Sequence, residues 1–204
     1  MFHVEHLFVL LAGFCPDGQG RGDGTMRGEK VHIRFLTLDD AEAKLQMELD
    51  NKEFFKEFSV ITGEDFYTLL MQKEVIEQST ENREAGREYN FAIVENETGR
   101  LVGSINLFRI FRGPLQSSMI GYVVDKKFNG RGYATEAIRL AADYAFQELG
   151  LHRIEAGVMP HNAPSIRALE KAGFEREGLA RKNVQINGQW QDHVVMAIIN
   201  PEDE

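Results

Sequence analysis

The sequence contains little cysteine and few apolar runs. Its single cysteine, Cys15, has no partner for an internal disulfide, so a reducing compartment such as the cytoplasm is the default expectation. The apolar stretch at 7–15 is too short for a membrane-spanning helix, which takes about 20 residues. No Lys or Arg precedes that stretch, so it does not match a secretory signal. We therefore expect a cytoplasmic protein with no membrane partner.

Basic charge is also scarce. The 204 residues include 23 Lys and Arg against 32 Asp and Glu, a formal net charge of -9. A general nucleic-acid binder needs a basic face, so we expect no nucleic-acid partner. The acidic balance suits cationic ligands, although many proteins share it. With 43% hydrophobic residues the chain can bury the core of one ordinary domain.

The first 25 residues differ from the rest in composition. Residues 16–24 (PDGQGRGDG) have the composition of a flexible linker, and Met26 stands just before the first strand-like segment. We expect residues 1–25 to be a flexible extension that is not native, upstream of a natural start at Met26. A native but loosely attached arm is the alternative. Residues 26–204 are predicted to form a single domain without internal repeats.

Hydrophobic periodicity predicts a domain of the α/β (α+β) class. Alternating apolar residues predict strands at 30–36, 89–95, 101–110, 118–125 and 153–158, from residue 174, and through 194–199. Helical spacing predicts helices at 39–49, from residue 64, at 134–149 and at 162–173. The short turns between strands predict mostly antiparallel pairing. The expected architecture is a mixed central sheet of about seven strands with helices on both faces.

A glycine-rich segment, residues 127–134 (KFNGRGYA), joins a predicted strand to the most regular predicted helix. Such a junction has free backbone N–H groups and the positive end of a helix dipole, and glycine lets a phosphate approach closely. The segment therefore predicts an anion site, although a tight turn that needs glycine for shape is the alternative. A dinucleotide fingerprint would need a third glycine where Thr135 stands.

Several separated motifs agree in order and spacing with one superfamily. They are Gly121-Tyr122, the glycine loop, Asn162 with Ser165, Glu170 to Phe174, Glu177-Gly178, and Asn187 to Asp192. Together they resemble the GNAT acetyltransferase superfamily, and most closely its RimJ/RimL-like group, over roughly residues 28–200. The resemblance implies a GNAT fold with a splayed strand pair and an N-acetyltransferase that uses acetyl-CoA and no metal. It also implies direct transfer to an amine acceptor, such as a ribosomal or other protein N-terminus, and allows a homodimer.

The resemblance further implies a cofactor site. In such enzymes the strand before the glycine loop offers backbone groups to the pantetheine arm, and one N–H polarises the thioester carbonyl. Lys127 and Arg131 are expected to pair with phosphates, with exposed loop cations as the alternative. The expected cofactor-binding residues are Val123, Val124, Asp125, Lys127, Asn129, Gly130, Arg131, Gly132, Tyr133, Ala134, Asn162 and Arg167.

The proton transfers are less well defined. By the same resemblance, the predicted catalytic residues are Ser165 as the acid, Glu177 as the best remaining carboxylate, and Asn162 as a contact to the pantetheine or a water. The alternatives are that Ser165 and Asn162 only cap a helix and that Glu177 is a strand-face charge. His161 and His193 can titrate near neutrality, but histidines in such places are more often incidental.

The chain departs from its relatives at three positions. Leu169 stands where many GNAT enzymes have Tyr, and Met119 and Val184 stand where many relatives have Glu. These departures leave open a non-catalytic CoA-binding sensor. A small-molecule amine acetyltransferase, acting on a polyamine, amino acid or antibiotic, is the other alternative. Residues 54–87 are expected to form the acceptor side, but their aromatic residues do not decide between acceptors.

Overall fold

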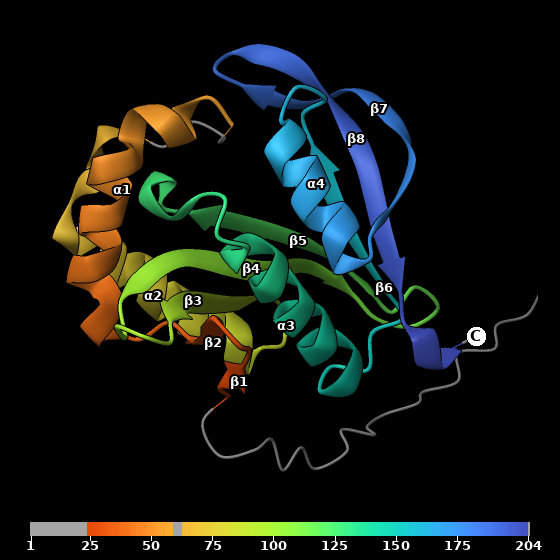
Figure 1. The fold of residues 1–204 in the computed structure, drawn as a ribbon, viewed down its shortest axis with the longest axis horizontal. Helices are drawn as coiled ribbons and strands as arrows, with labels where there is room; N and C mark the ends of the chain where they lie inside the picture. The colour runs from red at the N-terminus through yellow and green to blue at the C-terminus, as the bar shows by residue number, and fades with distance from the viewer. Residues whose placement is uncertain (1–23, 59–62, 204) are drawn as a thin grey trace, which may run out of the picture.

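The structure is a computed structural model that describes residues 24–58 and 63–203 (Figure 1). Cys15 and most of the predicted extension lie outside the described residues. The strands are β1 Met26–Arg27, β2 Val31–Phe35, β3 Tyr89–Glu95, β4 Leu101–Phe111, β5 Ser117–Val124, β6 Arg153–Val158, β7 Glu175–Ile186 and β8 Gln189–Ile199. The α-helices are α1 Ala41–Lys56, α2 Leu69–Glu84, α3 Tyr133–Gln147 and α4 Ala163–Ala172. The seven predicted strands are confirmed, and the two-residue β1 is additional.

All of these strands join one sheet in the order β1-β2-β3-β4-β5-β6-β8-β7. Every neighbouring pair is antiparallel except β5 and β6, which run parallel. Parallel neighbours need a crossover connection, and α3 supplies it. The predicted mixed, mostly antiparallel sheet is therefore confirmed.

Helices cover both faces of the sheet (Figure 1). On β3, Phe91 and Ile93 pack into the core beneath α3, whereas Ala92 and Val94 pack on the other face against Ile76 of α2. This alternation explains why β3 is apolar on both sides. The face of α3 that packs on the sheet consists largely of small side chains. They are the almost completely buried alanines Ala137, Ala141, Ala142 and Ala145.

The parallel pair separates after three residues. Ser117 to Met119 of β5 pair with Arg153 to Glu155 of β6, and no pairing follows between the rest of these two strands. From Ile120 onward β5 stays paired with β4 alone. The splayed strand pair that the family resemblance implies is therefore present, and it opens toward the carboxyl ends of β5 and β6.

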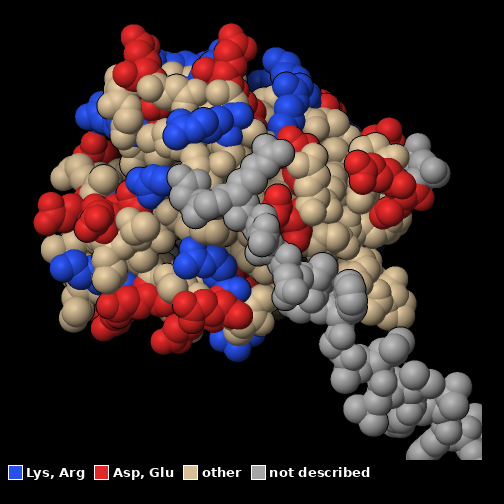
Figure 2. All heavy atoms as spheres, turned by 90° about the horizontal axis from the view of Figure 1, so that it is seen from below, with Lys and Arg blue, Asp and Glu red and all other residues tan. Residues whose placement is uncertain are grey.

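Charge is distributed without one dominant basic patch on the face seen in Figure 2, where Lys and Arg side chains are interspersed with Asp and Glu. In the described part of the chain, no helix is long and apolar enough to cross a membrane. Residues 24–58 and 63–203 also contain no group of three or more His, Cys, Asp or Glu side chains that could hold a metal ion.

Candidate active site

The opening between the separated ends of β5 and β6 is called the splay below. The glycine loop leads directly into α3 beside the open end of this splay. Gly130 and Gly132 have φ values of +79° and +87°, and Gly132 is the N-cap of α3. A Cβ at Gly130 would meet no atom within 4 Å, and one at Gly132 would meet only Lys30 Nζ, at 3.7 Å. The backbone conformation, not crowding, therefore requires glycine here. Because the first amides of a helix lack intrahelical acceptors, the loop presents free donors to an anion.

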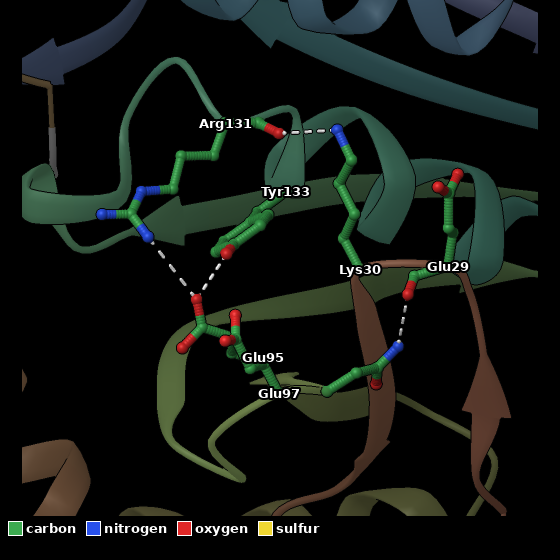
Figure 3. A pocket seen from close by; sticks show the side chains of 7 residues that line it. Glu29, Lys30, Glu95, Glu97, Arg131 and Tyr133 are labelled. Carbon is green, nitrogen blue, oxygen red and sulfur yellow. Dashed lines mark hydrogen bonds and ion pairs between the residues drawn. The ribbon is translucent and has the colours of Figure 1, made fainter.

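A buried carboxylate fixes the position of the loop (Figure 3). Glu95 accepts hydrogen bonds from Tyr133 Oη and, at 2.6 Å, from Thr98 Oγ1, and these bonds hold the pKa of Glu95 below its usual range. Arg131 lies 3.6 Å from Glu95 Oε1, and Lys30 Nζ donates to the Arg131 carbonyl at 3.2 Å. These contacts line a cavity of about 380 Å³ next to the loop and tie the loop to the ends of β2 and β3.

The two predicted phosphate partners are ion-paired in the structure. Lys127 Nζ lies 2.6 Å from Asp50 Oδ2, and this hydrogen bond raises the pKa of Lys127. Arg131 pairs with Glu95 and lies over the Phe128 ring, 5.0 Å from its centroid. Either cation would have to exchange a carboxylate for a phosphate, whereas the loop amides need no such exchange. The backbone amides are therefore more preorganised for an anion than the two cationic side chains are.

The register of β5 decides which of its backbone groups face the splay. Asp125 N–H donates to Val102 O at 2.8 Å, and the antiparallel alternation then directs the Val123 amide toward β4 as well. The amides of Val124 and Tyr122 point the other way, where β6 has separated. Of the three predicted backbone contacts, the geometry thus favours Val124. It disfavours Val123 and Asp125, and it adds Tyr122.

A cavity of about 190 Å³ lies in the splay. The polar side chains that line it are Tyr122, Asn162, Ser165 and His193. Asn162 Oδ1 accepts the Ser165 N–H at 3.2 Å, so the predicted N-cap is present. The Tyr122 hydroxyl lies 2.8 Å from Ser165 Oγ and 3.2 Å from the Ser165 carbonyl oxygen. Burial raises the pKa of Tyr122 to about 12, against the lowering effect of the Ser165 hydrogen bond. Tyr122 therefore stays protonated at physiological pH.

The sequence motifs predict no chemical role for Tyr122, but the fold places its hydroxyl in this cavity. Leu169, at the place where many relatives carry Tyr, lines the same cavity and is fully buried. A phenol thus enters the cavity from β5, whereas α4 has none at that place. The Gly-Tyr motif was visible in the sequence, but only the fold shows that this hydroxyl meets Ser165.

Glu177 lies away from the cavity. It is exposed on β7 and accepts a hydrogen bond from Arg153 Nη1 at 2.8 Å, which lowers the pKa of Glu177. Arg153 pairs with Ser117 at the closed end of the splayed strands. The structure therefore favours the strand-face interpretation of Glu177. Among the described residues that line the cavity there is no carboxylate.

Other residues lie on the elements that flank the splay. Arg167 is exposed on α4. Phe58, at the end of α1, lines the cavity and lies 5.8 Å from the His161 ring. Asn187, at the turn between β7 and β8, donates to the Lys56 carbonyl at 2.8 Å. The end of α1, the loop before α4 and the last hairpin therefore meet on one side of the splay.

These features define the protein as an acyl-transferring enzyme. The chain belongs to the GNAT family, because residues 30–175 match the model described as an acetyltransferase (GNAT) domain, and it is an N-acetyltransferase. The probable N-acetyltransferase YjcK of Bacillus subtilis (strain 168) is 51% identical over 179 residues, which are 88% of this chain and 99% of YjcK.

Two solved structures are similar over most of their length. The ribosomal-protein-S5-alanine acetyltransferase from Vibrio fischeri has a TM-score of 0.83 at 26% identity, over 89% of this chain and all of that chain. RimJ from Mycobacterium smegmatis, solved in complex with CoA-disulfide, has a TM-score of 0.80 at 30% identity, over 84% of this chain and 83% of that chain. The RimJ/RimL-like character predicted from the motifs is confirmed.

Proposed function

We propose that the enzyme transfers acetyl from acetyl-CoA directly to the α-amine of a protein N-terminus. The observation that carries this proposal is the splay itself, with free β5 amides on one side, the glycine loop at its open end and a part-buried hydroxyl pair inside. The names of the two solved relatives support a protein acceptor and a CoA cofactor. A ribosomal acceptor and the lone Cys15 both favour a cytoplasmic location.

The residues present fit this cofactor. The amides from Gly130 to Ala134 receive the pyrophosphate, with Lys127, Asn129 and Arg131 at its edges. The backbone of Val124 and Tyr122 receives the pantetheine arm as an added strand would be received. Asn162 has amide hydrogen-bonding capacity beyond its capping bond, and Arg167 lies exposed on the same helix for the nucleotide end.

The chemistry follows from the groups in the cavity. A neutral amine attacks the thioester carbonyl, so that an N–C bond forms while the C–S bond breaks. A backbone N–H of β5 stabilises the developing oxyanion. Ser165 Oγ donates a proton to the departing sulfur, and Tyr122 holds Ser165 by its hydrogen bond. Direct transfer is proposed because no cysteine is among the described residues that line the cavity.

Glu95→Gln is expected to weaken acetyl-CoA binding by about three- to tenfold. The substitution weakens the Tyr133 and Thr98 bonds that fix the loop, while it also frees Arg131 for the phosphates. The first effect dominates because the carboxylate is buried, whereas the Arg131 pair is half-exposed and long, at 3.6 Å. Titration calorimetry with acetyl-CoA measures the change. Glu97→Gln is the matched control in the same cavity, and tighter binding to Glu95→Gln would contradict the expected order of effects.

Thiol release tests the function as a whole. We expect the enzyme to release CoA thiol from acetyl-CoA with a peptide that begins with alanine, and the peptide to gain one acetyl group by mass spectrometry. Release with spermidine or an aminoglycoside but with no peptide would replace the protein acceptor by a small amine. Thermal stabilisation by acetyl-CoA without release in any acceptor panel would identify a sensor.

A further inference from the structure

The splay contains one titratable side chain that the chemistry above does not use. We infer that His193 of β8 is the general base that removes the proton from the acceptor amine. The inference rests on the proposed acetyl transfer and adds the residue that it lacks. His193 lines the same cavity as Tyr122 and Ser165, and it is buried, with 6% of its surface exposed.

Strand alternation places His193 on the face of the sheet opposite the hydroxyl pair. Along β8, Val194, Met196 and Ile198 pack toward the core that includes α3 and α4, so His193, out of phase with them, faces the side of α1 and α2. Gly157 of β6 faces the same way, and a Cβ there would lie 3.6 Å from the His193 Cδ2 atom. The two faces are visible in Figure 1, with α3 and α4 on the near side of the sheet.

Tyr122 belongs to the other face. Its neighbours in phase on β5, Ile120 and Val124, are part of the core beneath α3, and its hydroxyl reaches Ser165 on α4. The cavity is therefore lined by a hydroxyl pair from the α3–α4 side and by an imidazole from the α1–α2 side. Such an arrangement serves a displacement in which the leaving sulfur and the attacking amine need opposite proton transfers at the same time.

The hydrogen bonds of His193 leave the correct nitrogen free. Nδ1 lies 3.3 Å from the Gln191 carbonyl oxygen, which can only accept, so Nδ1 carries the hydrogen and Nε2 holds the lone pair. Nε2 makes no hydrogen bond, yet it is not a fully buried unpartnered atom, because among the described residues Ser118 Oγ is the one such side-chain atom. Nε2 is therefore accessible from the cavity that His193 lines. With no carboxylate lining the cavity, Nε2 is its only side-chain nitrogen lone pair among the described residues.

With His193 as the base, every proton that moves in the reaction has a donor and an acceptor. As the N–C bond forms, one amine proton passes to His193 Nε2, and as the C–S bond breaks, the sulfur takes a proton from Ser165 Oγ. The imidazolium then gives its proton to solvent, and solvent returns one to the hydroxyl pair. The attacking amine must be neutral, and an α-amine ordinarily titrates at about 7.7–8.0, against about 10.4 for a lysine-type amine. An N-terminal acceptor therefore has more of the reactive form at physiological pH.

His193→Asn tests the assignment. The asparagine amide can still donate to the Gln191 carbonyl but offers no basic nitrogen, so we expect kcat to fall about 100-fold and the KM for acetyl-CoA to change less than about threefold. His193→Gln, which keeps more of the side-chain volume, is expected to lose as much. His161→Gln is the matched control, because His161 is near the opening but does not line the cavity.

The outcomes separate this inference from the proposed function. If the wild type releases no thiol with any amine, the proposed function fails. If the wild type is active and either His193 variant, stabilised normally by acetyl-CoA, keeps kcat within about threefold of it, the inference is overturned. A fall in kcat that free imidazole partly restores in His193→Ala supports the base and excludes a purely structural role.

Discussion

Gly132→Asp is expected to reduce acetyl-CoA affinity by roughly 100-fold or more, the largest binding effect of any single substitution in the loop. Gly132 is the N-cap of α3, and its amide neighbours are the proposed pyrophosphate donors. An aspartate there puts a carboxylate where the phosphates bind, so the electrostatic interaction between residue 132 and the phosphates becomes repulsive. The free protein should remain folded, since Asp is among the few residues that visit left-handed backbone and its charge stabilises a helix N-terminus.

The control must separate charge from backbone strain, because Gly132 has a φ of +87°. Gly132→Asn has nearly the same shape, tolerates this conformation as well as Asp does and carries no charge. Binding of acetyl-CoA followed by calorimetry should lose no more than about tenfold in Gly132→Asn. Equal losses in the two variants would show that loop shape, not repulsion of phosphate, is responsible. Unchanged binding in both would show that the loop is only a turn.

Local patterns predicted most of the fold and suggested the cofactor half of the candidate site. The apolar stripe of α3 and the glycines before it are neighbours in sequence, so their spacing alone predicts a helix N-terminus with free amides. The Asn162 cap is equally local, since its partner Ser165 is three residues away. These features need no knowledge of how distant strands pair.

The catalytic half depends on long-range register, which sequence spacing does not determine. Whether Val123 or Val124 faces the splay depends on the pairing of β5 with β4, where a single-residue shift exchanges the two faces. The hydroxyl of Tyr122 meets Ser165 across 43 residues of sequence, and His193 enters the cavity through the pairing of β8 with β6. Glu177 is likewise paired across 24 residues of sequence, and its spacing from the other motifs does not indicate that Arg153 is its partner.

Ser165→Ala and Tyr122→Phe, tested singly and together, are expected to behave as one unit. Removing Ser165 Oγ should lower kcat about 100-fold, because the departing thiolate loses its proton donor. Removing the Tyr122 hydroxyl should cost about tenfold, since Ser165 keeps its proton but loses the partner that orients it. The double variant should be no slower than Ser165→Ala by more than about twofold, because both changes interrupt the same hydrogen bond.

Steady-state rates with a saturating peptide acceptor measure this cycle, and Tyr144→Phe is the matched control. Tyr144 is also a tyrosine whose pKa is raised to about 12 by burial, but it lies on α3, where it is partly buried against Phe91, and it is not among the residues that line the splay. Because the pKa of Tyr122 is also about 12, ionisation of Tyr122 should cause no loss of activity up to about pH 10. Multiplicative losses would mean that the two hydroxyls act independently, and full activity of Ser165→Ala would place the sulfur's proton donor elsewhere.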